Sequence, residues 1–243
     1  MKMLTFAGRN AKEILRDPLN LAFGLGFPLV LLLLLSAIQA NIPVDLFQIG
    51  HLSPGITVFG LSFMTLFSAT ILAKDRGSSF LQRLYTTPMR ASDFILGYML
   101  PMVPLAVAQC AICYAAAICL GLELSVKILY AVLSSVPVAL LYIAIGLLGG
   151  SLLSDKQVGG ICGALLTNLS AWLSGTWFDL DLVGGAFRKV AYALPFVHAV
   201  DMERAVLAGD YAGIFPHLWW VLGYAMVLSA AAVFFFLRQM KKQ

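Results

Sequence analysis

The stretch ILYAVLSSVPVALLYIAIGLLGG, residues 128 to 150, carries no charged side chain and is long enough to cross a lipid bilayer as one helix. A hydrocarbon core about 30 Å thick needs roughly 20 consecutive apolar residues in a helix. Over all 243 residues, only 12% are charged and 60% are hydrophobic, whereas soluble domains carry about 25% charged residues. The composition predicts an all-α integral membrane protein, and we expect a single membrane domain, residues 1 to 243, without a soluble catalytic domain.

Other stretches have the same apolar character, so we expect six transmembrane helices. They cover residues 19 to 38, 53 to 73, 94 to 120, 128 to 150, 158 to 177 and 217 to 237. The third is longer than a bilayer requires and contains Pro101 and Pro104. Because proline removes a backbone donor, we predict a kink there.

Basic residues are unevenly distributed between the segments that connect these stretches. Lys and Arg are frequent before the first stretch, in residues 74 to 92 and after the last stretch, while the alternate connections hold few. Cytoplasmic segments of membrane proteins carry such an excess. The pattern predicts a multi-pass protein of the cytoplasmic (inner) membrane with both termini cytoplasmic. It also explains the net charge of +4 without a nucleic-acid partner.

Residues 1 to 18 are predicted to form a cytoplasmic helix that lies on the membrane surface. Apolar side chains recur three and four residues apart, at Leu4, Ala7, Ala11, Ile14 and Leu15. This spacing places them near one face, with most charged side chains elsewhere. Asp17-Pro18 ends the helix, because a residue before proline disfavours the helical region. A cleaved secretory signal is disfavoured, because the apolar run that follows exceeds the usual length of about 7 to 15 residues.

The polar insert KDRGSSFLQRLYTTPMRAS, residues 74 to 92, lies between the second and third stretches and carries helix signals of its own. Phe80, Leu81, Leu84 and Tyr85 form an apolar stripe, and Thr87-Pro88 stops the helix. We predict a short amphipathic helix in a cytoplasmic loop. Two simpler interpretations stay open: a solvated loop that satisfies the positive-inside rule, and a helix that lies on lipid.

The segment from 178 to 212 is too polar to span, yet it contains the apolar run VAYALPFVHAV. This combination predicts an extracytoplasmic re-entrant helical hairpin, broken at Pro195. The alternative is an ordinary outer loop that rests on the membrane surface.

Three regions in order along the chain resemble one family. The first is ILRDPLNLAFGLGFPLVLLLLL, residues 14 to 35, with its Arg-Asp-Pro and Pro28. The second is the insert, with Gly77, Phe80, Leu81, Leu84, Thr87-Pro88, Asp93 and Gly97. The third is LSGTWFDLDLVGGAFRKVAYALPFVHAVDMERAVLAGD, residues 173 to 210, with Ser174-Gly175, Leu194-Pro195, Ala199, Arg204 and Gly209. Together they resemble the ABC type-2 exporter permeases over essentially the whole chain.

The sequence departs from this family at three places. The family loop often starts with acidic residues around a Glu, where this chain has Lys74-Asp75-Arg76. Tyr98 stands where a lysine is common, and Asp179 replaces a frequent proline. The charge-pairing role of that Glu therefore does not carry over directly.

The resemblance implies a transport subunit, not an enzyme, that works with a separate ATP-binding-cassette ATPase and a second permease subunit, identical or related. The chain itself contains no G-x-x-x-x-G-K-[ST] run to cradle phosphates, so ATP and Mg are expected on the partner and no cofactor on this chain. The implied ATPase-coupling residues are Phe80, Leu81, Arg83, Leu84, Thr87, Pro88 and Arg90. The implied outer gate comprises Ser174, Gly175, Leu194, Pro195 and Arg204.

The fifth stretch offers small residues that permit close helix approach. Gly159, Gly160 and Gly163 are candidates for a dimer seam, since the family uses spans one and five around the subunit interface. Asn168 is expected to be a buried amide that either lines the pathway or ties two helices together.

Imidazole and carboxylate groups, the common metal ligands, occur at His198, Asp201, Glu203 and His217. His198 and Asp201 are also ordinary i, i+3 neighbours on a helix near the membrane interface. We favour this second interpretation and expect no metal. Cys110, Cys113, Cys119 and Cys162 fall inside predicted spans and are expected to pack as small apolar residues.

The apolar spans favour a hydrophobic or amphipathic drug-like cargo that enters from membrane lipid and is exported. The alternative cargo is a lipid or a lipid-linked glycan. An ion-gradient-coupled transporter is disfavoured, because the six stretches contain no Asp or Glu. An intramembrane protease is disfavoured because no G-x-S-x-G run occurs.

Overall fold

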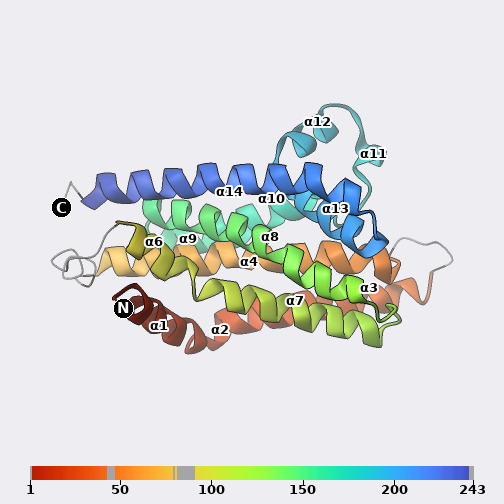
Figure 1. Cartoon of the computed structure of the whole chain (residues 1–243), viewed down its shortest axis with the longest axis horizontal. Coiled ribbons are helices and arrows are strands. Elements are labelled where there is room, and N and C mark those ends of the chain that lie inside the picture. The colour runs from red at the N-terminus through yellow and green to blue at the C-terminus, as the bar shows by residue number, and fades with distance from the viewer. Residues whose placement is uncertain (1, 43–46, 79, 81–90, 241–243) are drawn as a thin grey trace.

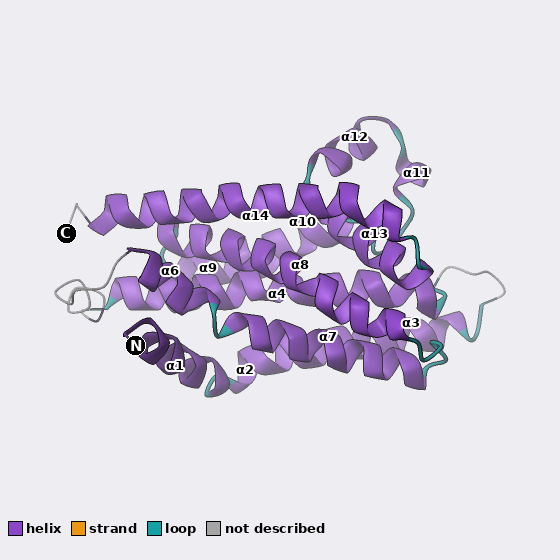
Figure 2. Ribbon diagram, in the orientation of Figure 1, coloured by secondary structure: helices purple, strands orange, loops and turns teal. Residues whose placement is uncertain are grey.

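The computed structural model describes residues 2–42, 47–78, 80 and 91–240, which form helices joined by turns, without a strand among them (Figures 1 and 2). In chain order the helices are α1 (Lys2–Leu15), α2 (Pro18–Leu21), η1 (Ala22–Gly26), α3 (Phe27–Gln39), α4 (Ile49–Gly77), α6 (Ala91–Met99), α7 (Met102–Cys119), α8 (Val126–Leu152), α9 (Asp155–Val158), η2 (Gly159–Leu165), α10 (Leu166–Leu173), α11 (Leu180–Val183), α12 (Gly185–Ala193), α13 (Pro195–Ala208) and α14 (Tyr211–Met240).

The longer helices lie side by side in an elongated bundle (Figure 1). The start of α1 and the end of α14 lie at the same end, which we call the proximal end, and we call the opposite end distal. The prediction that both termini lie on one side of the membrane requires such a placement. Their cytoplasmic location stays a prediction.

Five helical segments of the described chain are long and apolar enough to cross a membrane. They are Pro18–Gln39, Ile49–Gly77, Asp93–Cys119, Val126–Leu152 and Tyr211–Arg238. Five of the six predicted spans therefore have a counterpart. The remaining one, 158 to 177, is the run α9, η2 and α10, which is not among the five and ends at Leu173. The chain turns after Leu173, where Gly175 adopts the left-handed φ of 68° that glycine tolerates.

The third predicted span is divided at Pro101 into α6 and α7, so the predicted kink is confirmed. Pro101 has no N–H to donate to the carbonyl of Gly97, four residues earlier. That carbonyl instead accepts a hydrogen bond of 3.0 Å from the Asn10 side chain of α1. Pro104 falls in the first turn of α7, where a missing N–H costs little.

The helices α4 and α8 form the centre of the bundle and approach closely. Gly146 faces the Ser68 side chain and the Thr65 carbonyl, with no space for a Cβ. Hydroxyl groups of α4 also bond across the contact, from Thr65 Oγ1 to the Tyr142 carbonyl at 3.0 Å and from Ser68 Oγ to the Ile143 carbonyl at 3.2 Å. Small residues and hydroxyl bridges are the usual means of helix association in lipid.

The buried face of α1 differs from the predicted apolar stripe. Phe6, Asn10 and Ile14 are buried against the bundle, whereas Leu4 and Leu15 are 60% and 68% exposed. The prediction that Leu4 and Leu15 share one apolar face with Ile14 is therefore only partly right: α1 has one face on the protein and a second apolar edge that points outward.

A helix boundary lies at Leu194-Pro195, as predicted. Pro195 occupies the first turn of α13, where its fixed φ fits and no donor is lost. Beyond this boundary α13 enters the bundle and packs on α14, α8 and α4, while α11 and α12 project from its side (Figure 1). The depth of these helices in a bilayer stays a prediction.

Candidate functional site

At the proximal end, the carboxylate of Asp75 connects three helices. Arg9 of α1 donates to it through both terminal nitrogens, Nη1 to Oδ2 at 2.6 Å and Nη2 to Oδ1 at 2.9 Å. The Tyr98 hydroxyl of α6 donates to Oδ2 at 2.8 Å. Asp75 is only 3% exposed, and removing one partner of such a buried, two-pronged pair leaves an uncompensated charge. The end of α4 is therefore held to α1 and to α6.

Aromatic packing reinforces this connection. The Phe6 ring lies 4.9 Å from the Tyr98 ring and 6.1 Å from the Phe94 ring, edge to face in both cases. Phe6 also fills the space in front of Gly97, where a Cβ would collide with its ring. We call the set Phe6, Arg9, Asn10, Asp75, Gly97 and Tyr98 the proximal junction.

Phe80 extends the proximal junction into the predicted coupling helix. Its ring stacks on Phe6 at 6.4 Å, and the Arg9 guanidinium carbon lies 4.3 Å from its centroid. The other predicted coupling residues lie outside the described residues: Leu81, Arg83, Leu84, Thr87, Pro88 and Arg90. Phe80 thus contacts α1 here, a packing that the stripe alone did not predict, and the ATPase-docking role of the set stays a prediction.

The departures from the family pattern at this place are explained by the geometry. Asp75 takes a charge-paired position with Arg9, and Tyr98 offers a hydroxyl to the same carboxylate. Arg76 turns the other way and donates to the Gly150 carbonyl at 2.6 Å, near the end of α8, where a cation is favoured. The sequence KDR therefore attaches α4 to two different neighbours.

At the distal end, three of the five predicted gate residues meet. Arg204 of α13 donates from Nη2 to the Gly175 carbonyl at 2.9 Å and lies 3.3 Å from His51 Nδ1 of α4. Ser174 forms a 2.7 Å hydroxyl pair with Thr176 beside it. Burial lowers the pKa of Arg204. The turn after α10 is in this way joined to α13 and to the first turn of α4.

Leu194 and Pro195 lie at the opposite end of α13, and α14 clamps the turn that they form. The Tyr224 hydroxyl donates to the Ala193 carbonyl at 2.7 Å. His198 lies 2.9 Å from His217, Nδ1 to Nδ1, and its Nε2 bonds the Tyr192 carbonyl at 3.0 Å. A carbonyl only accepts, so His198 Nε2 carries a hydrogen, and a neutral His198 accepts from His217 at Nδ1.

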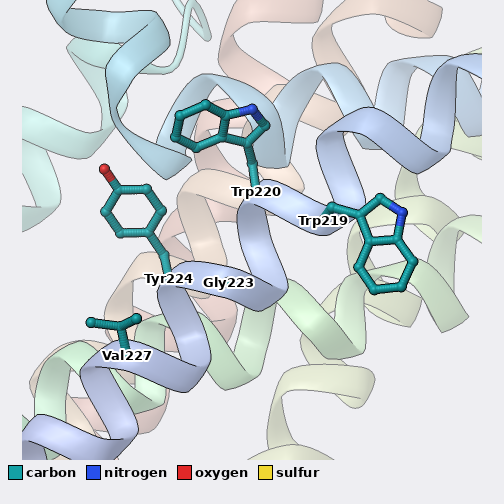
Figure 3. A pocket seen from close by; sticks show the side chains of 5 residues that line it. All are labelled: Trp219, Trp220, Gly223, Tyr224 and Val227. Carbon is teal, nitrogen blue, oxygen red and sulfur yellow. The ribbon is translucent and has the colours of Figure 1, made fainter.

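An aromatic groove adjoins this clamp. Figure 3 shows Trp219, Trp220 and Tyr224 projecting from α14, with Val227 below them. These side chains and Gly223 line a groove of about 540 Å³, and the Trp220 ring stacks on His198 at 4.8 Å. Within the part of the chain that the structure describes, no group of three His, Cys, Asp or Glu side chains could hold a metal ion.

The predicted seam residues lie on the surface of the chain. Gly159 and Gly160 are exposed, with nothing within 4 Å of the position that a Cβ would take, and Gly163 faces Leu66. The prediction that Asn168 is a buried amide is wrong for this chain: it is exposed and donates to the Ala164 carbonyl of its own helix at 2.8 Å. A polar side chain in an apolar stretch satisfies itself locally here. The dimer-seam role stays a prediction.

The fold and its junctions define a helical, multi-pass membrane protein. The chain matches the family described as ABC-2 type transporter over residues 2–208, and it belongs to that family. Its membrane domain is thus the transmembrane component of an ABC transporter, and such domains work in general with an ATP-binding-cassette partner. A comparison with curated proteins gave no match.

Proposed function

We propose that this chain is the transmembrane subunit of an ATP-driven exporter, energised by a separate ATPase subunit that binds ATP and Mg, and that it moves a hydrophobic or amphipathic drug-like compound outward. The observation that supports the proposal most is the proximal junction. Residues 81–90, which hold all the predicted coupling residues except Phe80, lie in the chain between Phe80 and α6. Both flanks of that segment are attached to the Arg9–Asp75–Tyr98 connection, so force applied there reaches α1, α4 and α6 together.

The continuous helix α4 carries this motion to the distal end. It has 29 residues, about 43 Å at 1.5 Å per residue. Asp75 lies near its last turn. His51 and Gly55 lie near its first turns, where His51 meets Arg204 and the Gly55 carbonyl accepts a 3.4 Å bond from Thr176. A shift of α4 at the ATPase side would therefore act on the proposed outer gate.

We infer a six-span topology in the cytoplasmic (inner) membrane, with both termini in the cytoplasm. Ends on the same side require an even number of crossings. The run Asp155–Leu173 follows the proximal end of α8 and contacts α13 through α10, which supports a sixth crossing. The exposed Gly159 and Gly160 lie on this run and support a seam with a second permease subunit.

The aromatic groove on α14 supports the choice of cargo. Its volume of about 540 Å³ falls in the range of about 300 to 1,000 Å³ that accommodates drug-sized ligands. Its lining is aromatic and aliphatic, which suits an amphipathic compound that arrives from lipid. A lipid or lipid-linked glycan is the alternative cargo and would use the same architecture.

Reconstitution tests the proposal. The chain and the ATP-binding-cassette subunit that co-purifies with it are placed in liposomes, and the movement of a fluorescent lipophilic amine dye is followed with and without ATP. We expect ATP-dependent transport that the double variant Phe80→Ala, Leu84→Ala loses while the complex still assembles. Normal transport by that variant would refute the coupling assignment. Transport by the chain alone, driven by an ion gradient and indifferent to ATP, would refute the function.

A further inference from the structure

Glu203 is a fully buried carboxyl in the bundle, at 0% exposure. It projects from α13, which is not one of the five candidate spans, and reaches α7 and α8. Its Oε2 accepts from the Tyr114 hydroxyl at 3.0 Å, and its Oε1 lies 2.9 Å from Ser134 Oγ. The surrounding cluster is apolar, with Ala131 and Val206 at its centre. Among the described residues, the Glu203 carboxyl is thus held by two hydroxyl groups.

Five of the described basic groups on α13 and the helices around it are engaged away from Glu203. Arg204 contacts Gly175, His51 and Asp201. His51, on α4, is thus engaged by Arg204 and not by Glu203. Lys127 of α8 bonds the Ala208 carbonyl, His217 of α14 bonds His198, and Arg188 of α12 pairs with Asp181. From α7, the facing titratable groups are Tyr114 and the Cys110 thiol. A buried carboxylate without a cation is strongly unfavourable.

The hydrogen-bond geometry fits the protonated acid. Ser134 Oγ also lies 3.0 Å from the Ala131 carbonyl, which only accepts, and a serine hydroxyl has one hydrogen. If Glu203 carries a proton on Oε1, it donates to Ser134, Ser134 donates to Ala131, and Tyr114 donates to Oε2, so every contact is a hydrogen bond. If Glu203 is ionised, Ser134 must turn to the carboxylate and abandon the Ala131 carbonyl.

The pKa of Glu203 also favours the protonated acid. Burial raises the pKa of Glu203 to about 8, against the smaller opposing effect of the hydroxyl donors Ser134 and Tyr114. The acid is consequently neutral at pH 7 and close to titration just above it.

A pocket at the distal end lies next to the side-chain cluster that surrounds Glu203. It has a volume of about 580 Å³, and its lining includes His51, Lys127, Ile128, Arg204 and Leu207. Leu207 follows Glu203 by four residues on α13, about 6 Å along the helix, and packs with Ile128 against the cluster of Tyr114. Leu207 and Ile128 therefore line the pocket and also pack against the cluster around the carboxyl.

We propose that Glu203 is a proton-binding site, filled and emptied through the distal pocket, whose occupancy keeps α13 docked between α7 and α8. On release, the O–H bond of the acid breaks, the proton passes to water in the pocket, and the carboxylate is left without a cation. The bundle can then solvate it only if α13 moves away from Tyr114 and Ser134. The binding of the proton is independent of cargo, whereas its effect on transport rests on the proposed function.

Infrared spectroscopy of the purified full chain in lipid nanodiscs, titrated with pH, tests the site directly. We expect a carbonyl band of a protonated carboxyl that disappears with a midpoint near 8 and that is missing in Glu203→Gln, a variant that preserves the neutral shape. Asp201→Asn, on the same helix, is the matched control and should keep the band. A spectrum unchanged by Glu203→Gln, or a midpoint near the ordinary value of about 4.3, would overturn the proposal.

The same preparations, reconstituted with the ATPase subunit, separate the two proposals. We expect the pH dependence of dye transport above pH 7 to flatten in Glu203→Gln. A titrating band in a chain that shows no ATP-dependent transport would refute the proposed function and leave the proton site standing. ATP-dependent transport by a chain that lacks the band would refute the proton site and leave the proposed function standing.

Discussion

Arg9 and Asp75, 66 residues apart in the sequence, meet in a two-pronged ion pair with distances of 2.6 and 2.9 Å. The pair joins a helix that precedes the first span to the end of the central helix α4. Tyr98 adds a third helix through the same carboxylate. The proximal parts of α1, α4 and α6 are therefore joined at Asp75.

Removing the cation of this pair should destabilise the fold. In Arg9→Ala, the buried Asp75 loses the charged one of its two described side-chain partners, and we expect the free energy of unfolding to fall by roughly 1 to 3 kcal/mol, the usual cost of a buried polar group left unsatisfied. Chemical denaturation of the detergent-solubilised chain measures this loss. Glu13→Gln is the control, because Glu13 also contacts Arg9 but is 36% exposed, and its change should stay within about 1 kcal/mol. Equal effects of both variants would contradict the importance of Asp75.

Gly97 is predicted to tolerate no side chain. In Gly97→Ala, the new methyl group would overlap the Phe6 ring, so α1 must shift and the Arg9–Asp75 pair must stretch. We expect faster proteolysis of α1 and weaker ATP-dependent transport. Gly8→Ala on α1 has open space around its Cβ and should be neutral or stabilising by up to about 1 kcal/mol. Matching protease sensitivity in the two variants would argue against close packing of Phe6 on α6.

The contact between His198 and His217 should weaken in acid. Burial lowers the pKa of His198, so below its ordinary value of about 6.5 the unfolded chain binds a proton that the folded chain does not. Stability therefore falls as pH drops below about 6.5 towards the lower folded pKa. Thermal unfolding as a function of pH, compared between the wild type and His198→Gln, isolates this contribution, and the variant should lose less stability in acid. The same pH dependence in both proteins between pH 7 and 5 would be inconsistent with this assignment.

Glu203 should produce the opposite slope at higher pH. Its pKa is raised to about 8 in the fold and is about 4.3 when unfolded, so the folded chain holds the extra proton between these values. The contribution of this bound proton to stability is complete below about pH 4.3 and is lost as the pH rises through about 8. Glu203→Gln should lack this decline and unfold at a higher temperature than the wild type at pH 8.5. A lower unfolding temperature for the variant at that pH would count against a neutral Glu203.

Local signals in the sequence predicted the helices and their breaks. Pro101 and Pro195 interrupt helices for reasons that belong to proline itself, and the structure has boundaries at both. The apolar stretches likewise reappear as helices, because a bilayer demands their length and composition. These features require no knowledge of neighbouring segments.

Features that depend on the mutual placement of helices could not be predicted. No property of Arg9 alone indicates Asp75 as its partner. Asn168 was expected to be buried because its stretch is apolar, yet composition does not tell which side of a helix faces its own chain. Glu203 was assigned to a polar outer segment, because charges and apolar residues alternate there, and only the fold places α13 inside the bundle.

The most direct test of the proposed coupling compares Asp75→Asn with the wild type in liposomes that also contain the ATPase subunit. Both complexes are first checked for equal assembly, and ATP-dependent movement of the lipophilic dye is then measured. The proximal junction predicts that Asp75→Asn retains the bound ATPase and loses most of its transport, because α1 no longer moves with α4. Wild-type transport by Asp75→Asn would contradict the role of this junction in carrying force from the ATPase to the membrane helices.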